Sequence, residues 1–227
     1  MVLLDDNFAT IVNAVEEGRI VYDNIRKFVR YTMTSNAGEI CVMVLGPLLG
    51  MPLPLLPLQI LWINLVTDGL PGLALAIEKA ERDTMKRPPY PPQAHIFDRP
   101  MIRDIAWIGL LMGIVSLLMG YFYWSSNPEQ ERHWRTLVFT VLTLTQMGNA
   151  MAIRSTRDSL FRIGVFSNPA MIGSVALTFT LQLAVVYWQP LQDIFMTTGL
   201  TAGEFLGCIL LSTVVFWAIE LQKKLIG

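Results

Sequence analysis

The chain has 227 residues, of which 53% are hydrophobic and only 15% are charged, and its mean hydropathy is +0.47. Soluble globular proteins carry about a quarter charged residues, so this composition indicates lipid as the solvent and excludes an ordinary soluble domain. The net charge of −1 indicates no particular partner, and no nucleic-acid partner is expected.

Residues 5–30 are predicted to form an amphipathic helix, because apolar residues recur there at roughly helical spacing. Acidic residues come early and basic residues late, which suits the helix dipole, and Asp5, Asp6 or Asn7 could cap the first turn. No helix breaker separates this segment from the apolar block that follows. One long rod is therefore expected to run from the cytoplasm into the membrane and to transmit motion.

Six apolar blocks follow, each near the roughly 20 residues that a helix needs to cross a bilayer. They lie at about 31–51, 57–77, 101–124, 135–153, 169–188 and 204–222. The sequence therefore predicts an all-α polytopic membrane helix bundle with six transmembrane helices, the first of which extends into the cytoplasm. A short, uncharged turn rich in proline and glycine predicts a tight hairpin between the first two spans.

The basic residues are distributed unevenly between the two sides of the predicted bundle. Of 17 Lys and Arg residues, only Arg132 and Arg135 fall in the segments opposite the termini. By the positive-inside rule both termini are expected to be cytoplasmic, as an even number of spans requires. The protein is thus predicted to be a multi-pass integral membrane protein, with the bacterial plasma membrane as the expected host and an organelle membrane as the alternative.

The loop at 78–100 is densely charged and contains a PPYPP stretch that is expected to be extended. It could be a docking surface for a soluble domain or a solvated connector, and the sequence favours neither.

Two carboxylates lie deep inside predicted spans, where each charge costs roughly 3 kcal/mol on insertion scales. Glu39 shares a helix face with Asn36 in the first span, and Asp68 shares one with Asn64 and Thr67 in the second. The tight hairpin makes these spans neighbours, so the two oxygen-bearing faces are expected to meet. Hard cations such as calcium require several oxygen ligands with carboxylates among them.

The run that follows Asp68 adds a helix irregularity to this site. Pro71 removes a backbone donor and is expected to free the carbonyl of Thr67, while the neighbouring glycines let the helix unwind. Freed carbonyls at membrane depth are cation ligands where they line a cavity. The alternative is a simple proline kink, with polar residues that only hold helices together.

Two further sets of polar residues are weaker candidates. Gln146 and Asn149 share a face of the fourth span, where buried amides serve either as contacts between helices or as ligands. Glu204 and Glu220 lie at the ends of the last span and are expected to be solvated or interfacial.

Taken together, these stretches resemble the type II P-type ATPases of the calcium-transporting type over essentially the whole chain. The run 3–31 is similar to the exit from the phosphorylation domain into the fifth membrane helix of that family. SNAGEI at 35–40 resembles the cation-site motif of the fifth helix, and LWINLVTDGLPGLAL at 61–75 resembles that of the sixth, which is partly unwound in the family. TQMGNA at 145–150 is similar to the eighth helix.

By this resemblance, residues 1–30 are a cytoplasmic hinge or stalk leaving the phosphorylation domain. Residues 31–227 are the carboxy-terminal transmembrane domain, helices five to ten of the pump. The resemblance implies cation ligands at Asn36, Glu39, Asn64, Thr67, Asp68 and Gln146. Asn64 favours calcium over the sodium–potassium pumps, which have an aspartate there, with manganese and sodium as alternatives. Gln146 stands where the muscle reticulum calcium pump has a glutamate. A glutamine at this place is similar to the plasma-membrane calcium pumps and to sodium pumps.

The implied function is the membrane part of an ATP-driven cation pump that exports calcium. The chain contains no Asp-Lys-Thr-Gly-Thr motif and no nucleotide-binding domain, so alone it is not expected to hydrolyse ATP. The transported cation is expected to be Ca²⁺, with ATP and Mg²⁺ only in the intact pump. Expected partners are the lipid bilayer, the first four helices of the pump, and its phosphorylation, nucleotide and actuator domains. The alternatives are a freestanding cation channel or carrier, an accessory membrane protein, and a purely structural bundle.

Overall fold

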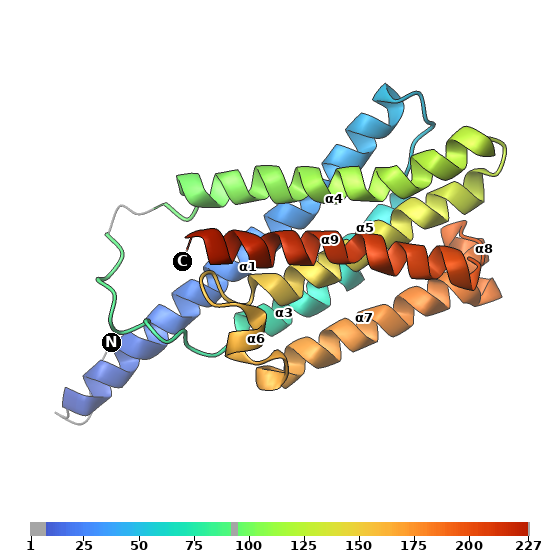
Figure 1. Cartoon of the computed structure of the whole chain (residues 1–227). Coiled ribbons are helices and arrows are strands. Elements are labelled where there is room, and N and C mark those ends of the chain that lie inside the picture. The colour runs from blue at the N-terminus through green and yellow to red at the C-terminus, as the bar shows by residue number, and fades with distance from the viewer. Residues whose placement is uncertain (1–7, 92–94, 227) are drawn as a thin grey trace.

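The computed structural model describes residues 8–91 and 95–226, which form helices joined by turns and loops (Figure 1). The predicted capping residues Asp5, Asp6 and Asn7 lie outside the described residues. The helical composition confirms the predicted all-α membrane bundle, and the described chain begins and ends at the same end of that bundle (Figure 1).

The longest element is α1, a helix of 41 residues from Phe8 to Leu48. At 1.5 Å per residue it is about 60 Å long, twice the thickness of a bilayer core of roughly 30 Å. Its first part, residues 8–30, is called the stalk here, and the start of this stalk projects beyond the other helices (Figure 1). The predicted uninterrupted rod is therefore present, and a tight turn with positive φ at Gly50 follows it.

The second predicted span consists of three pieces. Helix α2 covers Pro57–Trp62, the π-helix η1 covers Ile63–Thr67, and α3 covers Gly69–Ala76. The backbone N–H of Asp68 donates to the carbonyl of Ile63 at 2.9 Å, which is the i→i−5 bond of a π turn. The expectation that the helix unwinds at this point is therefore wrong in detail, because the helix widens by one residue and stays hydrogen-bonded.

Four further long helices and three short ones complete the bundle. The long helices are α4 (Arg99–Ser126), α5 (Glu131–Ile153), α7 (Pro169–Tyr187) and α9 (Ala202–Ile226). The short ones are α6 (Leu160–Ile163), η2 (Val165–Ser167) and α8 (Gln189–Phe195). Helices α4 and α7 each begin with proline at one of their first positions and with an Asp or Asn side chain that accepts a first-turn N–H.

Five stretches of the described chain are long and apolar enough to cross a membrane: α2 to α3, α4, α5, α7 and α9. They coincide with five of the six predicted spans within a few residues. The remaining segment, 31–48 of α1, is not among them, and Ser35, Asn36 and Glu39 make it more polar than the others. The sixth crossing thus stays a prediction, supported by the extensive packing of α1 against α4.

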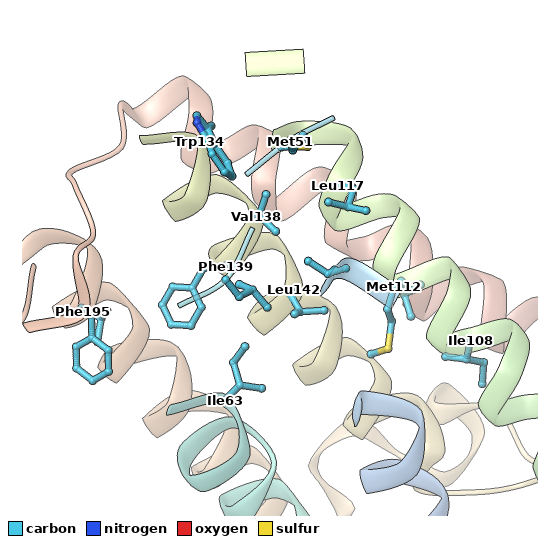
Figure 2. Packing of buried hydrophobic residues seen from close by; sticks show 14 of the residues in the cluster. Met51, Ile63, Ile108, Met112, Leu117, Trp134, Val138, Phe139, Leu142 and Phe195 are labelled. Carbon is cyan, nitrogen blue, oxygen red and sulfur yellow. The ribbon is translucent and has the colours of Figure 1, made fainter. Parts of the chain in front are cut away.

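The hydrophobic core is centred on α5, which is buried on nearly all sides. Trp134, Val138, Phe139 and Leu142 of this helix meet apolar side chains from the surrounding elements, including Ile63 of η1 (Figure 2). Because every face of α5 packs against protein, the polar residues that it carries are held in fixed positions inside the bundle.

Helices α1 and α4 approach closely through small residues. A Cβ atom built on Gly109 would lie 2.5 Å from the Cβ of Ala37, and one on Gly113 would lie 2.4 Å from the Sγ of Cys41. Small residues permit such contacts between membrane helices, where packing supplies much of the stability. This contact fixes the position of α1, and therefore of Glu39, against the rest of the bundle.

Residues 78–91, the described first part of the loop after the second span, lie along the stalk. The Nη1 atom of Arg19 donates to the carbonyls of Thr84 (2.9 Å) and Arg87 (2.8 Å), and Arg87 forms an ion pair with Asp23. This part of the loop is therefore held against α1 by side-chain hydrogen bonds and an ion pair. Whether it also docks another domain stays a prediction.

The expected solvated or interfacial position of Glu220 is wrong. Its side chain is buried and pairs with Lys223 Nζ at 2.8 Å, and it also accepts from the Ser159 hydroxyl. Glu204 begins α9 and lies partly exposed, with one carboxylate oxygen 2.8 Å from Nε2 of His133. Both acids thus join α9 to neighbouring segments at the two ends of the bundle.

Candidate cation site

Glu39 is buried in the middle of the bundle and connects three elements. Its Oε2 accepts from Asn64 Nδ2 of η1 at 3.0 Å, and its Oε1 accepts from Gln146 Nε2 of α5 at 3.2 Å. Three of the predicted ligands, from positions far apart in the sequence, are therefore in direct contact. The amide groups of Asn64 and Gln146 both donate directly to the Glu39 carboxylate, so both side chains belong to the group of residues around Glu39.

Asp68 lies at the junction of η1 and α3 and is only 4% exposed. Neither of its carboxylate oxygens has a hydrogen-bond partner in the described part of the chain. It lies beside the hydroxyls of Tyr31 and Ser35 and close enough to Glu39 for the two carboxylates to interact electrostatically. A buried carboxylate without hydrogen bonds is costly, and a bound cation would remove that cost.

Thr67 contributes two oxygen atoms at the same level. Its hydroxyl is buried and has no partner among the residues described, while its carbonyl accepts a hydrogen bond from Tyr31 at 2.9 Å. This is the carbonyl that Pro71 was predicted to release. The structure shows that Tyr31 occupies it, a contact that the spacing of polar residues gave no means to foresee.

Asn36 and Asn64 lie at the edge of the site. Asn36 is half-buried, and no hydrogen bond of its side chain occurs within the described chain. Asn64 is exposed, and its Nδ2 donates to the Ile60 carbonyl at 3.0 Å as well as to Glu39. Apolar side chains nearby are also exposed, Ile40 by 64% and Leu65 by 70%. The site is thus closed by α4 and α5 on one side and open along α1 and η1 on the other.

Several oxygen atoms around Glu39 and Asp68 lack a hydrogen-bond partner within the described residues. They are Ser35 Oγ, Thr67 Oγ1, both carboxylate oxygens of Asp68, Gln146 Oε1 and Asn149 Oδ1. No group of three or more His, Cys, Asp and Glu side chains arranged for a metal occurs among the described residues. Two carboxylates with neutral oxygens suit a hard, oxygen-preferring cation, whereas zinc or copper would require nitrogen or sulfur ligands.

Two residues of this region were missed or undervalued by sequence reasoning. Ser35 precedes Asn36 in the SNAGEI stretch and faces Asp68, so its position beside a predicted ligand was the available signal. Asn149 is fully buried with both polar side-chain atoms unpaired among described groups, although an amide that joins helices should be hydrogen-bonded.

Paired acids buried inside a helical membrane domain, here beside a π-helical break, are typical of ion-transporting membrane proteins. Comparison with known sequences gives the family: residues 52–225 match the family described as "Cation transporting ATPase, C-terminus", and the chain belongs to it. The match covers η1, α3 and α5 but begins after Glu39.

Individual relatives extend the similarity to α1. The chain is 44% identical over 214 residues to a calcium-transporting ATPase of Bacillus subtilis, covering 94% of this chain and 24% of that protein. It is 32% identical over 224 residues to calcium-transporting ATPase 1 of Yarrowia lipolytica, covering 99% and 24%. It is 35% identical over 228 residues to rat calcium-transporting ATPase type 2C member 2, covering 98% and 24%. The chain thus spans about a quarter of the length of these relatives.

Proposed function

We propose that the chain is the membrane part of an ATP-driven pump that exports Ca²⁺. The names of its relatives support calcium as the ion, and the buried acids support a site for a divalent cation. One observation carries the proposal: the carboxylate of Asp68 is buried without a hydrogen bond from any described residue and lies beside Glu39.

The ligands that we propose are Asn36, Glu39, Asn64, Thr67, Asp68 and Gln146. In the structure, Asn64 and Gln146 donate their amide N–H groups to Glu39. When Ca²⁺ enters, half-turns of these amides would present their oxygens to it, and Glu39 would change from hydrogen-bond acceptor to ligand. Together with Glu39, Asp68 would supply the carboxylate oxygens that a hard divalent cation prefers.

The long helix α1 would couple this site to ATP hydrolysis elsewhere in a larger protein. Phosphorylation of an aspartate in another domain would shift the stalk, and the continuous helix would carry that shift to Glu39. The site would then alternate between access from the cytoplasm and from the outer side. This mechanism requires both termini on the cytoplasmic side, and we propose the bacterial plasma membrane as the host.

The open edge of the site indicates where the remainder of the pump would pack. Apolar residues of α1 and of the second span are exposed there: Ile40, Leu61, Leu65 and Leu73. We propose that the first four helices of the pump cover this face and supply further ligands. The phosphorylation, nucleotide and actuator domains would act through the stalk.

The test is cation-dependent ATPase activity in membranes from cells that express the reading frame containing this chain, including all sequence upstream of Met1. We expect activity stimulated by Ca²⁺ and lost in Asp68→Asn. The matched control is Asp193→Asn, which alters an exposed carboxylate of α8 and should keep full activity. Stimulation by Mn²⁺ or Na⁺ alone would contradict Ca²⁺ as the transported ion. A reading frame with no upstream catalytic domains would contradict the proposal that the chain is part of a pump.

A further inference from the structure

A cavity of about 560 Å³ lies at the stalk end of the bundle, away from the candidate cation site. It is bounded by α1, by Tyr90 and Asp98 of the loop before α4, by the start of α4, by the segment after α5 and by the last turns of α9. Six of the described residues that line it are cationic and two are acidic. The cations are Arg26, Lys27, Arg30, Arg103, Arg157 and Lys223, and the acids are Asp98 and Asp104.

Four of these cations each form an ion pair with a carboxylate of their own. The pairs are Arg26 with Asp98, Lys27 with Glu81 at 2.9 Å, Arg157 with Asp83 at 2.8 Å, and Lys223 with Glu220 at 2.8 Å. The other two, Arg30 and Arg103, share the single carboxylate of Asp104. Among the described residues, positive charge therefore exceeds negative charge at this one place in the wall.

Asp104 is fully occupied as an acceptor. Its Oδ2 accepts from Arg30 at 2.7 Å, while its Oδ1 accepts from Gln222 at 2.8 Å and from Trp107 and Arg103 at 3.3 Å each. The contacts at 3.3 Å are long for charge-assisted bonds, which indicates that the Arg103 guanidinium is only weakly held.

Arg30 is the most unusual of the cations in the wall. It is 9% exposed, and its Nε–H is buried without an acceptor in the described part of the protein. Burial lowers the pKa of this guanidinium, and Asp104 offsets only part of the effect. A buried guanidinium N–H without a partner is costly, and an anionic acceptor close by would remove that cost.

We propose that this cavity binds the phosphate group of an anionic phospholipid, with Arg30 and Arg103 as its principal donors. Guanidinium forks match phosphate oxygens in geometry as well as charge. Basic pockets between membrane helices at the cytoplasmic surface are suited to lipid head groups. On the same turns of α4 and α9, Ile102, Leu221 and Leu225 are more than half exposed, so acyl chains can lie against them.

The experiment measures which lipids the purified chain retains. The protein is assembled in nanodiscs with equal amounts of phosphatidylglycerol and phosphatidylcholine, released, and weighed by native mass spectrometry. We compare the wild type with Arg103→Gln, whose side chain is 56% exposed and therefore replaceable without loss of the fold. The matched control is Arg99→Gln, which removes the same charge one turn earlier on α4 from an exposed position that does not line the cavity.

We expect phosphatidylglycerol to be enriched over phosphatidylcholine in the wild type. Arg103→Gln should reduce that enrichment about fivefold, because a basic residue close to an anionic head group is worth about a factor of five. Arg99→Gln should reduce it less than about twofold, because Arg99 does not line the cavity that holds the head group. Equal retention of both lipids, or equal effects of the two variants, would overturn the proposal. If excess inorganic phosphate displaces the lipid completely, the phosphate site stands but a lipid is not its specific ligand.

Discussion

Arg154 at the end of α5 is the side chain on which the stalk end of the bundle most depends. It is 1% exposed, and its Nε and Nη2 donate to the two carboxylate oxygens of Glu78 at 2.9 and 3.0 Å. Its Nη1 donates to the carbonyls of Gly164 and Val165 at 3.3 and 2.9 Å. One guanidinium thus holds the end of the second span and the turn before α7 against α5.

The cost of removing Arg154 follows from what it leaves behind. Burial alone would raise the pKa of Glu78, but hydrogen bonds from Arg154 and Asn168 hold that pKa below its ordinary value, so the pair is ionised at neutral pH. Arg154→Met leaves the Glu78 carboxylate buried, with a hydrogen bond from Asn168 at 2.8 Å but no counter-charge from Arg154. Breaking a buried pair in this way costs about 3–5 kcal/mol. For a chain of this size, that corresponds to a loss of roughly 6–20 °C in Tm.

Thermal unfolding in detergent measures this loss, with a maleimide dye that reacts as Cys208, fully buried in the folded chain, becomes accessible. The matched control is Arg157→Met, three residues further on. Arg157 also pairs with a carboxylate, but its side chain is 72% exposed, so its removal should cost less than about 1 kcal/mol.

A double variant separates an unpaired charge from lost packing. Arg154→Met combined with Glu78→Met removes both charges, and we expect it to recover at least about half of the lost Tm, because an apolar pair can replace a buried ion pair. If the double variant is no more stable than Arg154→Met, or if Arg157→Met is equally unstable, the electrostatic explanation is wrong.

Three other changes test other parts of the structure by the same unfolding assay. Gly113→Ala places a Cβ atom 2.4 Å from an α1 side chain and should cost about 1–3 kcal/mol, whereas Gly173→Ala, with nothing within 4 Å, should be neutral or slightly stabilising. Tyr31→Phe removes the hydrogen bond to the last η1 carbonyl and should cost about 1 kcal/mol; an unchanged Tm would contradict that role. Burial by itself would raise the pKa of Asp98. Hydrogen bonds from Arg26 and from the first turn of α4 outweigh this effect and leave the pKa below its ordinary value. The stability that Asp98 adds is therefore present above about pH 4 and lost as the pH falls through its lowered pKa, a loss that Asp98→Asn should abolish.

Most of the fold could be predicted because each element has a strong local signal. Long apolar blocks separated by charged or proline-rich turns located the helices, and the absence of a breaker near residue 30 indicated the continuous rod α1. The segment 31–48 was harder to assign, since its polar face makes it less apolar than an ordinary span. That face is also what makes it a candidate site.

Only part of the site could be predicted, because some of its residues share a helix face in the sequence and others meet only in the folded bundle. Helical spacing places Glu39 with Asn36, and Asp68 with Asn64 and Thr67, before any tertiary contact is known. The hairpin then brings the two faces together. Spacing cannot show which amide reaches which carboxylate, so a place for Gln146 in the site was expected only from the resemblance, and its hydrogen bond to Glu39 was not expected.

Contacts that join distant segments were not predictable from the sequence. The bond from Tyr31 to the Thr67 carbonyl depends on where α1 crosses η1. The burial of Glu78 and Glu220 depends on loops that fold back over the stalk end. Both acids follow apolar blocks and so resembled ordinary interfacial charges, and only packing shows that they are enclosed and paired.

The most direct test of the proposed cation site is equilibrium Ca²⁺ binding to the purified chain, wild type against Glu39→Gln. We expect saturable binding in the range of about 10⁻⁴–10⁻³ M, weak because the open edge of the site lacks ligands, and at least about tenfold weaker in the variant. Glu129→Gln, which changes an exposed acid in the turn between α4 and α5, should bind as the wild type does. Undetectable binding, or equal binding by Glu39→Gln and the wild type, would show that these acids do not form a calcium site.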